Sequence, residues 1–521
     1  MVAAMSPAVS AQPVLGSIAP GKGPVGASVA ITGRDFSDVI AVRFGGVAAD
    51  SFTVDSDERI IAIVPDGAST GRISVETSEG TAESTESFQV QPNVVVIITD
   101  DQRWDTLPYM PIVTERLAGR GVTFNNAFVT NPLCCPSRVG FLTGQYSHRN
   151  GVWNNDEPYG GFHSFTGDGA TIATRLASEG YRTGLIGKYL NQYWETGGTY
   201  VPPGWDVWES YATEVGYYDY TLTFDARTFE SHGNASSDYA TDVLAADAAS
   251  FIRDTSAQDP LLLWFTPPAP HEPFLPAPRH AGTFEFIPPW RPPSFDERDV
   301  SDKPPYVSSK PRLGSAGIEA TDDRRQRQLE SLLAVDEAVG GILEALAATG
   351  RLGDTLVLFT SDNGYMWGEH RLGAKTVPYE ESIRVPFVVR WDRLADVPRT
   401  SDRMALNIDV APTLTAVTGA TPLPADGRSL VPLLEGTAAR WRSEFLLEHQ
   451  GRVVPSYCGI RTNSKVFVHY ADGSEEFYRL GTDPYQKNNA VAKPRLAADV
   501  SRLRDHARAR CQPRPPEMPP F

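Results

Sequence analysis

The spacing of apolar residues divides the chain near residue 92. Before that point, short stretches such as residues 28–32 and 72–76 alternate apolar and polar side chains, and glycine, proline or aspartate separates them. Alternation with a period of two is typical of a strand with one buried face. No helical period interrupts it, so residues 13–91 are predicted to form a small antiparallel β-sandwich.

After residue 92, apolar residues follow one another almost without a break in several short stretches, as expected for strands buried on both faces of a parallel sheet. Between these stretches, residues 170–179 and 325–346 place apolar side chains three and four positions apart, which predicts helices. Strands that alternate with helices indicate an α/β fold, in which a mostly parallel sheet carries helices on both faces. The predicted strands are residues 93–98, 182–186, 260–265 and 355–360.

Two further segments complete the predicted organisation. Residues 266–313 are rich in proline and are predicted to be a long irregular excursion, which inside a domain is usually functional. Residues 464–470 and 475–480 are predicted to pair as a hairpin, followed by a helix at 494–510. The predicted divisions are an N-terminal segment at 1–12, the sandwich at 13–91, the α/β domain at 92–439 and a small α+β subdomain at 440–521.

The most unusual short stretch holds two adjacent cysteines, Cys134 and Cys135, followed by Pro136. Proline suits the first turn of a helix, because the N–H that it lacks would have no partner there. Cys134 is therefore predicted to lie at a helix N-terminus, where free N–H groups and the helix dipole make a thiol unusually reactive. The competing interpretation is that both cysteines are small core residues.

Oxygen-donor side chains follow two of the predicted strands. Asp100 and Asp101 end the first, and Asp362 and Asn363 follow the strand at 355–360. Each pair alone could belong to a tight turn. Because ligands collect beyond the carboxyl ends of parallel strands, the two pairs are expected at one edge of the sheet. Carboxylate and amide oxygens bind hard divalent cations such as Ca²⁺ or Mg²⁺, so the sequence predicts a metal site there.

Positive and titratable side chains follow the same strands. Lys188 follows the strand at 182–186, His271 follows that at 260–265, and Lys375 lies beyond Asp362. Alone, each could be a solvated surface residue. Grouped at one sheet edge, they would bind a tetrahedral oxyanion and protonate a leaving oxygen. The residues favour a metal-assisted hydrolase of a small anionic ester, with an activated or modified cysteine.

Composition narrows the choice of partners. The chain has 521 residues, of which 41% are hydrophobic and 21% charged, and its net charge is −17, which argues against nucleic acid binding. The sequence contains no run of about 18 apolar residues, so no membrane span is predicted. Residues 1–12 are interpreted as a flexible end or as the remnant of a secretory signal. Nothing in the sequence sets the oligomeric state.

The other two cysteines, Cys458 and Cys511, both lie in the last segment. A pair there is compatible with a disulfide in an exported protein. The alternative is two unrelated thiols. We expect the disulfide, and with it a secreted or cell-envelope protein, with a cytoplasmic location as the alternative.

These motifs resemble those of the sulfatase family. Residues 134–138, Cys-Cys-Pro-Ser-Arg, are similar to the sulfatase signature Cys-x-Pro-Ser-Arg, and residues 92–102 resemble the first metal-binding strand of the family. Residues 362–364 resemble its second metal pair, and residues 379–386 are a further hallmark. The resemblance covers about residues 92–491 and implies an alkaline-phosphatase-like fold. The preceding block resembles an IPT/TIG immunoglobulin-like domain.

The resemblance also implies a mechanism. In sulfatases the first cysteine of the signature, here Cys134, is oxidised to Cα-formylglycine by a formylglycine-generating enzyme, whereas Cys135 would stay unmodified. The hydrated aldehyde would attack sulfur, with Arg138 steadying it and Asp362 accepting a proton. Lys188 and Lys375 would bind the sulfate, and His271 would protonate the leaving alcohol. The implied ligands of a calcium ion, with magnesium less favoured, are Asp100, Asp101, Cys134, Asp362 and Asn363.

One position departs from many arylsulfatases, which carry a histidine where this chain has Leu190. The stretch around it resembles the glucosamine-6-sulfatase branch, so the expected substrate is a small aryl or carbohydrate sulfate, for example of the N-acetylglucosamine 6-sulfate type. Asn191 is expected to line the site without titrating, and His370 to touch the substrate. The alternatives are a phosphonate or phosphate ester hydrolase of the same superfamily and, without enzymatic activity, a carbohydrate-binding protein.

Overall fold

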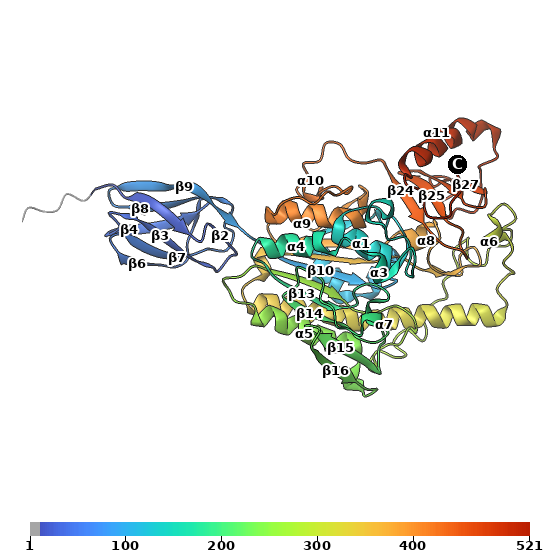
Figure 1. Cartoon of the computed structure of the whole chain (residues 1–521), viewed down its shortest axis with the longest axis horizontal. Coiled ribbons are helices and arrows are strands. Elements are labelled where there is room, and N and C mark those ends of the chain that lie inside the picture. The colour runs from blue at the N-terminus through green and yellow to red at the C-terminus, as the bar shows by residue number, and fades with distance from the viewer. Residues whose placement is uncertain (1–10) are drawn as a thin grey trace, which may run out of the picture.

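A computed structural model describes residues 11–521 (Figure 1). Most of the N-terminal segment predicted at residues 1–12 lies outside this part. The described chain begins with a β-sandwich, whose two sheets have the orders β1-β3-β7-β6 and β2-β9-β8-β4-β5. Inward side chains of both sheets form one core, to which β3 contributes Val29 and Ile31 and β4 contributes Val42 and Phe44. The alternation of apolar residues therefore gives the sandwich that the sequence predicts.

The strands of the sandwich are β1 (Val14–Ala19), β2 (Lys22–Gly23), β3 (Ser28–Arg34), β4 (Val39–Phe44), β5 (Val47–Ala48), β6 (Phe52–Ser56), β7 (Arg59–Ile63), β8 (Gly71–Thr77) and β9 (Gly80–Val90). In Figure 1 the sandwich lies beside the rest of the molecule. Lys22 joins the two parts through an ion pair of 2.7 Å with Glu179.

A sheet of ten strands forms the centre of the molecule. Its order is β16-β15-β14-β13-β17-β10-β18-β21-β11-β22, so the four strands that the sequence predicts lie side by side in its middle. They pair in parallel, whereas β21 and the outer hairpin are antiparallel, which makes the sheet mixed. The strands are β10 (Asn93–Thr99), β11 (Val122–Phe124), β13 (Arg182–Gly187), β14 (Val207–Tyr211), β15 (Tyr220–Phe224), β16 (Thr228–His232), β17 (Leu261–Thr266), β18 (Thr355–Ser361), β21 (Phe387–Trp391) and β22 (Arg399–Ser401).

Helices cover both faces of this sheet, as Figure 1 shows. On one face, Val95 and Ile97 of β10 share a core with α5 (Ala240–Asp254) and α7 (Ser315–Ala348). On the other, the alternate residues of β10 pack with α1 (Cys134–Thr143), α4 (Ile172–Ser178) and α9 (Val410–Thr418). Burial on both faces explains why β10 has no polar alternation and confirms the α/β prediction.

The predicted helix limits differ most in α7, which begins at Ser315 rather than at residue 325. Its first turns carry mostly polar side chains, whereas buried apolar residues start at Leu329. The spacing of apolar residues therefore predicted only the part of the helix that packs against the core. Before α7, the proline-rich segment contains a single short helix within the described residues, α6 (Pro305–Ser308), as the predicted excursion requires.

The last part of the chain is a small α+β unit. Strands β24 to β27 form an antiparallel sheet, and β26 and β27 make the predicted hairpin. A disulfide joins Cys458 of β25 to Cys511, the residue after α11, which confirms the expected pairing. Its elements are β24 (Glu444–His449), β25 (Tyr457–Thr462), β26 (Lys465–Tyr470), β27 (Glu475–Arg479) and α11 (Ala497–Arg510). The remaining short strands and α-helices are β12 (Ala127–Phe128), β19 (Met366–Trp367), β20 (Gly373–Ala374), β23 (Ala405–Leu406), α2 (Ser147–Asn150), α3 (Gly161–Ser164), α8 (Glu380–Ile383) and α10 (Val431–Leu434).

Candidate active site

The register of two neighbouring strands brings the acidic residues together. β10 and β18 pair in parallel with Thr99 opposite Ser361, so the residues that follow each strand leave the sheet at the same level. The backbone N–H of Asp101 donates to Asp362 Oδ1 at 3.1 Å. Asn363 Nδ2 donates to Asp101 Oδ1 at 2.6 Å. The predicted acidic group is therefore one contiguous cluster at the carboxyl edge of the sheet.

Helix α1 adds Cys134 to this group. Leu133 is extended and Cys134 is the first helical residue, with Pro136 in the first turn as the sequence predicts. The Cys134 side chain is buried, and its Sγ lies 3.5 Å from Asp100 Oδ1. Cys135, one position further around the helix, packs instead in the apolar core under the sheet. The two neighbours therefore face different environments.

Three basic side chains complete the arrangement, which we name the Cys134 cluster. Lys375 Nζ donates to Asp101 Oδ1 at 2.5 Å and to Cys134 Sγ at 2.9 Å. Lys188 Nζ donates to Asp100 Oδ2 at 2.5 Å. Arg138 Nε donates to Asp362 Oδ2 at 2.8 Å. The Cys134 cluster consists of Asp100, Asp101, Cys134, Arg138, Lys188, Asp362, Asn363 and Lys375.

The charges in the Cys134 cluster balance, because three carboxylates face three cations. Burial opposes ionisation of Lys188 and Asp100, but their mutual attraction prevails, so the pKa of Lys188 is raised and that of Asp100 is lowered. The pKa of Asp362 is raised by burial and by the charge of Asp100. A pre-formed set of largely buried charged groups is the setting in which electrostatic stabilisation of a reacting anion is strongest.

The thiol of Cys134 is not activated by its helix position, which corrects our expectation of a reactive thiol. Burial, followed by the charge of Asp100, raises its pKa to about 12. The N-terminal helix dipole is therefore outweighed by desolvation and a nearby carboxylate. With a raised pKa, the unmodified Cys134 side chain is a poor nucleophile, because the thiolate is the reactive form.

The donor set fits a hard divalent cation. Single carboxylate oxygens of Asp100, Asp101 and Asp362 and Cys134 Sγ all lie within 4.8 Å of one another. Asn363 Oδ1 is buried and accepts no hydrogen bond from the described residues. An amide oxygen without a partner beside three carboxylates is a ligand set for calcium or magnesium.

His271 lies at the outer edge of the cluster. Its Nε2 is 3.8 Å from Asp101 Oδ2, and its side chain is 33% exposed, so it faces both the buried acids and solvent. Tyr217 donates a hydrogen bond of 2.7 Å to the His271 carbonyl and fixes the start of the proline-rich segment. A histidine in this position can exchange a proton with a group that enters from solvent.

Two predicted substrate contacts make no hydrogen bond to the cluster within residues 11–521. His370 is buried, with Nδ1 2.6 Å from Glu297 Oε2 and its ring centroid 4.3 Å from that of Tyr379, while its Nε2 has no hydrogen-bond partner within the described residues. Family resemblance of the stretch around His370 suggested the substrate contact, but the side chain is buried against Glu297. Asn191 accepts from Phe162 N through its carbonyl, and the structure records no hydrogen bond between Asn191 and the cluster within residues 11–521.

Some positioning residues had no signal in the sequence. Asn155 Oδ1 accepts a hydrogen bond of 2.8 Å from the Cys135 amide and so helps to satisfy the free N–H groups at the start of α1. Arg103, two positions after Asp101, donates to Glu369 Oε1 at 2.9 Å and to the Tyr365 carbonyl at 3.0 Å. An isolated asparagine or arginine in a loop predicts no such role, because the partner is distant in sequence.

Comparison with known proteins identifies the class to which this fold and cluster belong. The chain belongs to the sulfatase family, whose model matches residues 92–420. A second model, N-sulphoglucosamine sulphohydrolase C-terminal, matches residues 368–511. The IPT/TIG domain model matches residues 13–90, in agreement with the predicted sandwich.

Among individual relatives, human N-acetylglucosamine-6-sulfatase is 34% identical over 382 residues, which are 69% of this chain and 68% of that protein. N-acetylglucosamine-6-O-sulfatase of Bacteroides thetaiotaomicron is 29% identical over 79% of this chain and 85% of its own length. The Drosophila melanogaster extracellular sulfatase SULF-1 homolog is 34% identical over 71% of this chain, and the alignment spans 34% of that relative. The alignment with the extracellular sulfatase Sulf-1 homolog of Caenorhabditis elegans spans 52% of that relative's length.

A solved structure described as a complex with its substrate D-glucosamine-2-N,6-O-disulfate has a TM-score of 0.70 and 26% identity, and covers 81% of this chain and 97% of its own. The phosphonate monoester hydrolase of Agrobacterium radiobacter has a TM-score of 0.63 at 21% identity, with 80% and 94% covered, and shares the fold. Within residues 11–521, no helix is both long and apolar enough to cross a membrane.

Proposed function

We propose that this protein hydrolyses sulfate monoesters, with a carbohydrate 6-sulfate of the N-acetylglucosamine type as the substrate class. The observation that carries the proposal is Cys134 Sγ, held at the start of α1 between Lys375 Nζ at 2.9 Å and Asp100 Oδ1 at 3.5 Å. A tetrahedral anionic group beside this atom would meet two lysines and a cation site. The N-acetylglucosamine-6-sulfatase relatives support the choice of sugar.

Two groups would be added to the chain before it acts. Oxidation of Cys134 to Cα-formylglycine by a formylglycine-generating enzyme would supply, as the hydrate, a hydroxyl nucleophile in place of the neutral thiol. A calcium ion, held by Asp100, Asp101, Asp362, Asn363 and residue 134, would supply Lewis acidity toward the sulfate oxygens. The unpartnered Asn363 Oδ1 supports the second assignment.

The side chains of the protein would then bind the anion and move protons. Lys188 and Lys375 would donate to the sulfate oxygens and stabilise charge as it develops. Arg138, held against Asp362 at 2.8 Å, would keep that carboxylate oriented toward residue 134 as a proton acceptor. His271, at the solvent edge, would protonate the leaving alcohol, since a sugar entering from solvent would place its bridging oxygen there.

Mass spectrometry and turnover would test this proposal together. We expect the peptide that contains residue 134 to be lighter by about 18 Da than its free-thiol form. We also expect sulfate release from N-acetylglucosamine 6-sulfate to depend on calcium. An active protein with unconverted Cys134 would contradict the mechanism. A higher kcat/KM for a phosphonate monoester than for any sulfate ester would favour the alternative phosphonate or phosphate ester hydrolase.

The location of the protein remains part of the proposal. The Cys458–Cys511 disulfide is the bond expected of an exported chain, and relatives described as extracellular sulfatases agree with it. Export can be tested by fractionating the native host and measuring sulfatase activity outside the cytoplasm. Activity confined to the cytoplasm would contradict export and leave the catalytic proposal unaffected.

A further inference from the structure

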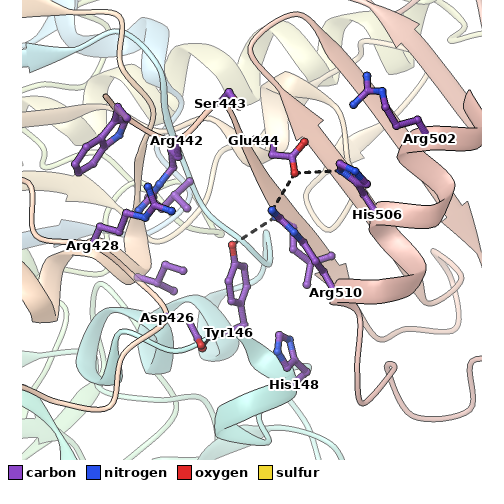
Figure 2. Close-up of a pocket in the computed structure, with 14 residues that line it drawn as sticks. Tyr146, His148, Asp426, Arg428, Arg442, Ser443, Glu444, Arg502, His506 and Arg510 are labelled. Atoms are coloured by element: carbon purple, nitrogen blue, oxygen red, sulfur yellow. Dashed lines mark hydrogen bonds and ion pairs between the residues drawn. The ribbon is translucent and has the colours of Figure 1, made fainter. Parts of the chain in front are cut away.

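A hollow of about 770 Å³ opens between the core and the C-terminal unit (Figure 2). Four arginines and two histidines line it, against two carboxylates. We name it the basic hollow and define it by Arg428, Arg442, Arg502, Arg510, His148 and His506. In a chain with a net charge of −17, a concentration of positive side chains is the local exception that an anionic partner would need.

The C-terminal helix forms one wall of the basic hollow. Arg502, His506 and Arg510 are spaced by four residues in α11, which places them on the same helix face. Figure 2 shows this face turned toward Tyr146 and Arg428 on the other side. This wall is anchored to the C-terminal sheet, because Arg504 of α11 donates a hydrogen bond of 2.5 Å to Glu475 of β27. The disulfide also links Cys511, the residue after α11, to Cys458 of β25. The groups are therefore pre-positioned, which lowers the cost of binding.

Carboxylates neutralise the positive side chains of the basic hollow only in part. His148 Nδ1 lies 2.7 Å from Glu448 Oε1, so this histidine has a partner of its own. Glu444 Oε1 is shared between His506 Nδ1 at 3.2 Å and Arg510 at 2.9 Å, and Asp426 is engaged by Arg149 at 3.1 Å. The Arg502 side chain is 49% exposed, and its nearest carboxylate, Asp499, is 3.5 Å away on the same helix.

Two arginines of the opposite wall differ in their availability. Arg442 forms a bidentate ion pair with Asp409. Both terminal nitrogens of Arg442 donate to a carboxylate oxygen of Asp409 at 2.6 Å. Arg428 is exposed and has no ion-pair partner within residues 11–521. Arg428 and Arg502 therefore keep donor capacity for a ligand, and Arg510 keeps part of its own. Guanidinium groups bind planar or tetrahedral oxyanions through paired hydrogen bonds.

The basic hollow is separate from the Cys134 cluster. Cys134 begins α1, whereas Tyr146 and His148 of the hollow follow its other end, and a helix of 10 residues spans about 15 Å. Within the described residues, no hydrogen bond joins a side chain that lines the hollow to the Cys134 cluster. A ligand in the hollow would therefore leave the reacting groups free.

We propose that the basic hollow binds an acidic saccharide, with its sulfate or carboxylate groups on Arg428, Arg502 and Arg510. The volume suits a ligand of two or three sugar units. Besides the arginines, Ser443, Glu444 and the histidines offer donors and acceptors to sugar hydroxyls. The choice of a saccharide rests on the proposed function, whereas the choice of an oxyanion rests on the arginines alone.

Equilibrium binding to the full chain would test the proposal, with a heparin-derived hexasaccharide as the probe and maltohexaose as its uncharged counterpart. The Cys134→Ala protein is used so that nothing is turned over. We expect R428A/R502A in this background to weaken hexasaccharide binding about tenfold or more, because each variant residue removes a charge-assisted donor. The control is R508A, since Arg508 lies on α11, is 52% exposed and does not line the hollow.

Three outcomes would overturn the proposal: unchanged hexasaccharide binding in R428A/R502A, equal weakening in R508A, or inorganic sulfate that binds the hollow as tightly as the hexasaccharide. Turnover of a small sulfate ester by R428A/R502A with Cys134 intact should stay within about twofold of the parent, because the hollow is remote from the cluster. If no sulfate ester were turned over, the catalytic proposal would fail while the binding result still stood.

Discussion

The Cys134 cluster and the basic hollow both gather charged side chains, but they do so in opposite ways. In the cluster, Arg138 is 4% exposed and Asp100 and Asp362 are fully buried, and each charge has an opposite partner. In the hollow, Arg502 and Arg510 are both 49% exposed, and Glu444 has to serve more than one cation. Buried charges require partners, whereas exposed ones are already stabilised by water.

This difference separates chemistry from recognition. A reacting anion gains most from charges that are fixed and desolvated before it arrives, as they are around Cys134. An acidic saccharide that is bound without reacting gains from donors that are solvated, numerous and not fully paired. Substitutions in or beside the two regions should therefore affect different measurements. Four predictions, given in order of decreasing effect, test this separation.

The largest effect is expected at Cys134. Cys134→Ala should abolish sulfate ester turnover, because the side chain that would become the nucleophile is removed. Cys135→Ala is the matched control, since the neighbouring side chain lies in the core and faces away from the cluster. The control should retain most of the turnover and lose some stability. An inactive Cys135→Ala with an active Cys134→Ala would show that the wrong cysteine has been assigned.

The second effect concerns stability. Arg138→Ala would leave the buried carboxylates of Asp362 and Asp100 without their nearest guanidinium, at 2.8 Å and 3.6 Å. We expect the metal-free protein to lose about 3–5 kcal/mol of unfolding free energy in urea titrations. Added calcium should recover part of the loss, because it would neutralise the same carboxylates. A loss below about 1 kcal/mol, or a loss that calcium does not change, would remove the contrast between the two regions.

The sequence predicted the cluster better than the hollow, for a physical reason. The cluster residues either follow buried strands or lie in a short sequence signature. A run of apolar residues therefore marks the position of a residue such as Asp100, which directly follows β10. The central strands were also predictable, because burial on both faces demands continuous apolar residues. Tertiary pairing alone decided that His370 turns inward toward Glu297, and no local pattern shows that.

The basic hollow had no such marker. Its walls come from the segment after α1, the segment after α9 and one face of α11, which meet only in the folded protein. The spacing of Arg502, His506 and Arg510 was visible in the sequence, but a row of charges on a helix is usually a solvated face. The facing wall with Arg428, which the fold alone supplies, turns that row into a candidate site.

The third prediction uses the disulfide, which anchors the wall formed by α11. The double substitution Cys458→Ser and Cys511→Ser opens a loop with a sequence separation of 53 and should cost about 2–4 kcal/mol. Because the bond ties α11 to β25, limited proteolysis should first cut the C-terminal unit, and hexasaccharide binding should weaken before turnover of a small ester does. Parallel loss of both activities across a temperature series would show that the hollow and the cluster unfold as one unit.

The smallest effect is expected for Arg510→Ala. Its ion pair with Glu444 is 2.9 Å long, but the Arg510 side chain is 49% exposed, so solvent screens much of the attraction. Glu444 also keeps His506 as a partner, and no buried charge is left alone. We therefore expect a change of at most about 1 kcal/mol in unfolding free energy, measured in the same urea titration as Arg138→Ala. A loss as large as that of Arg138→Ala would mean that Arg510 is a structural residue, and the distinction between buried, balanced charges and exposed, available ones would no longer hold.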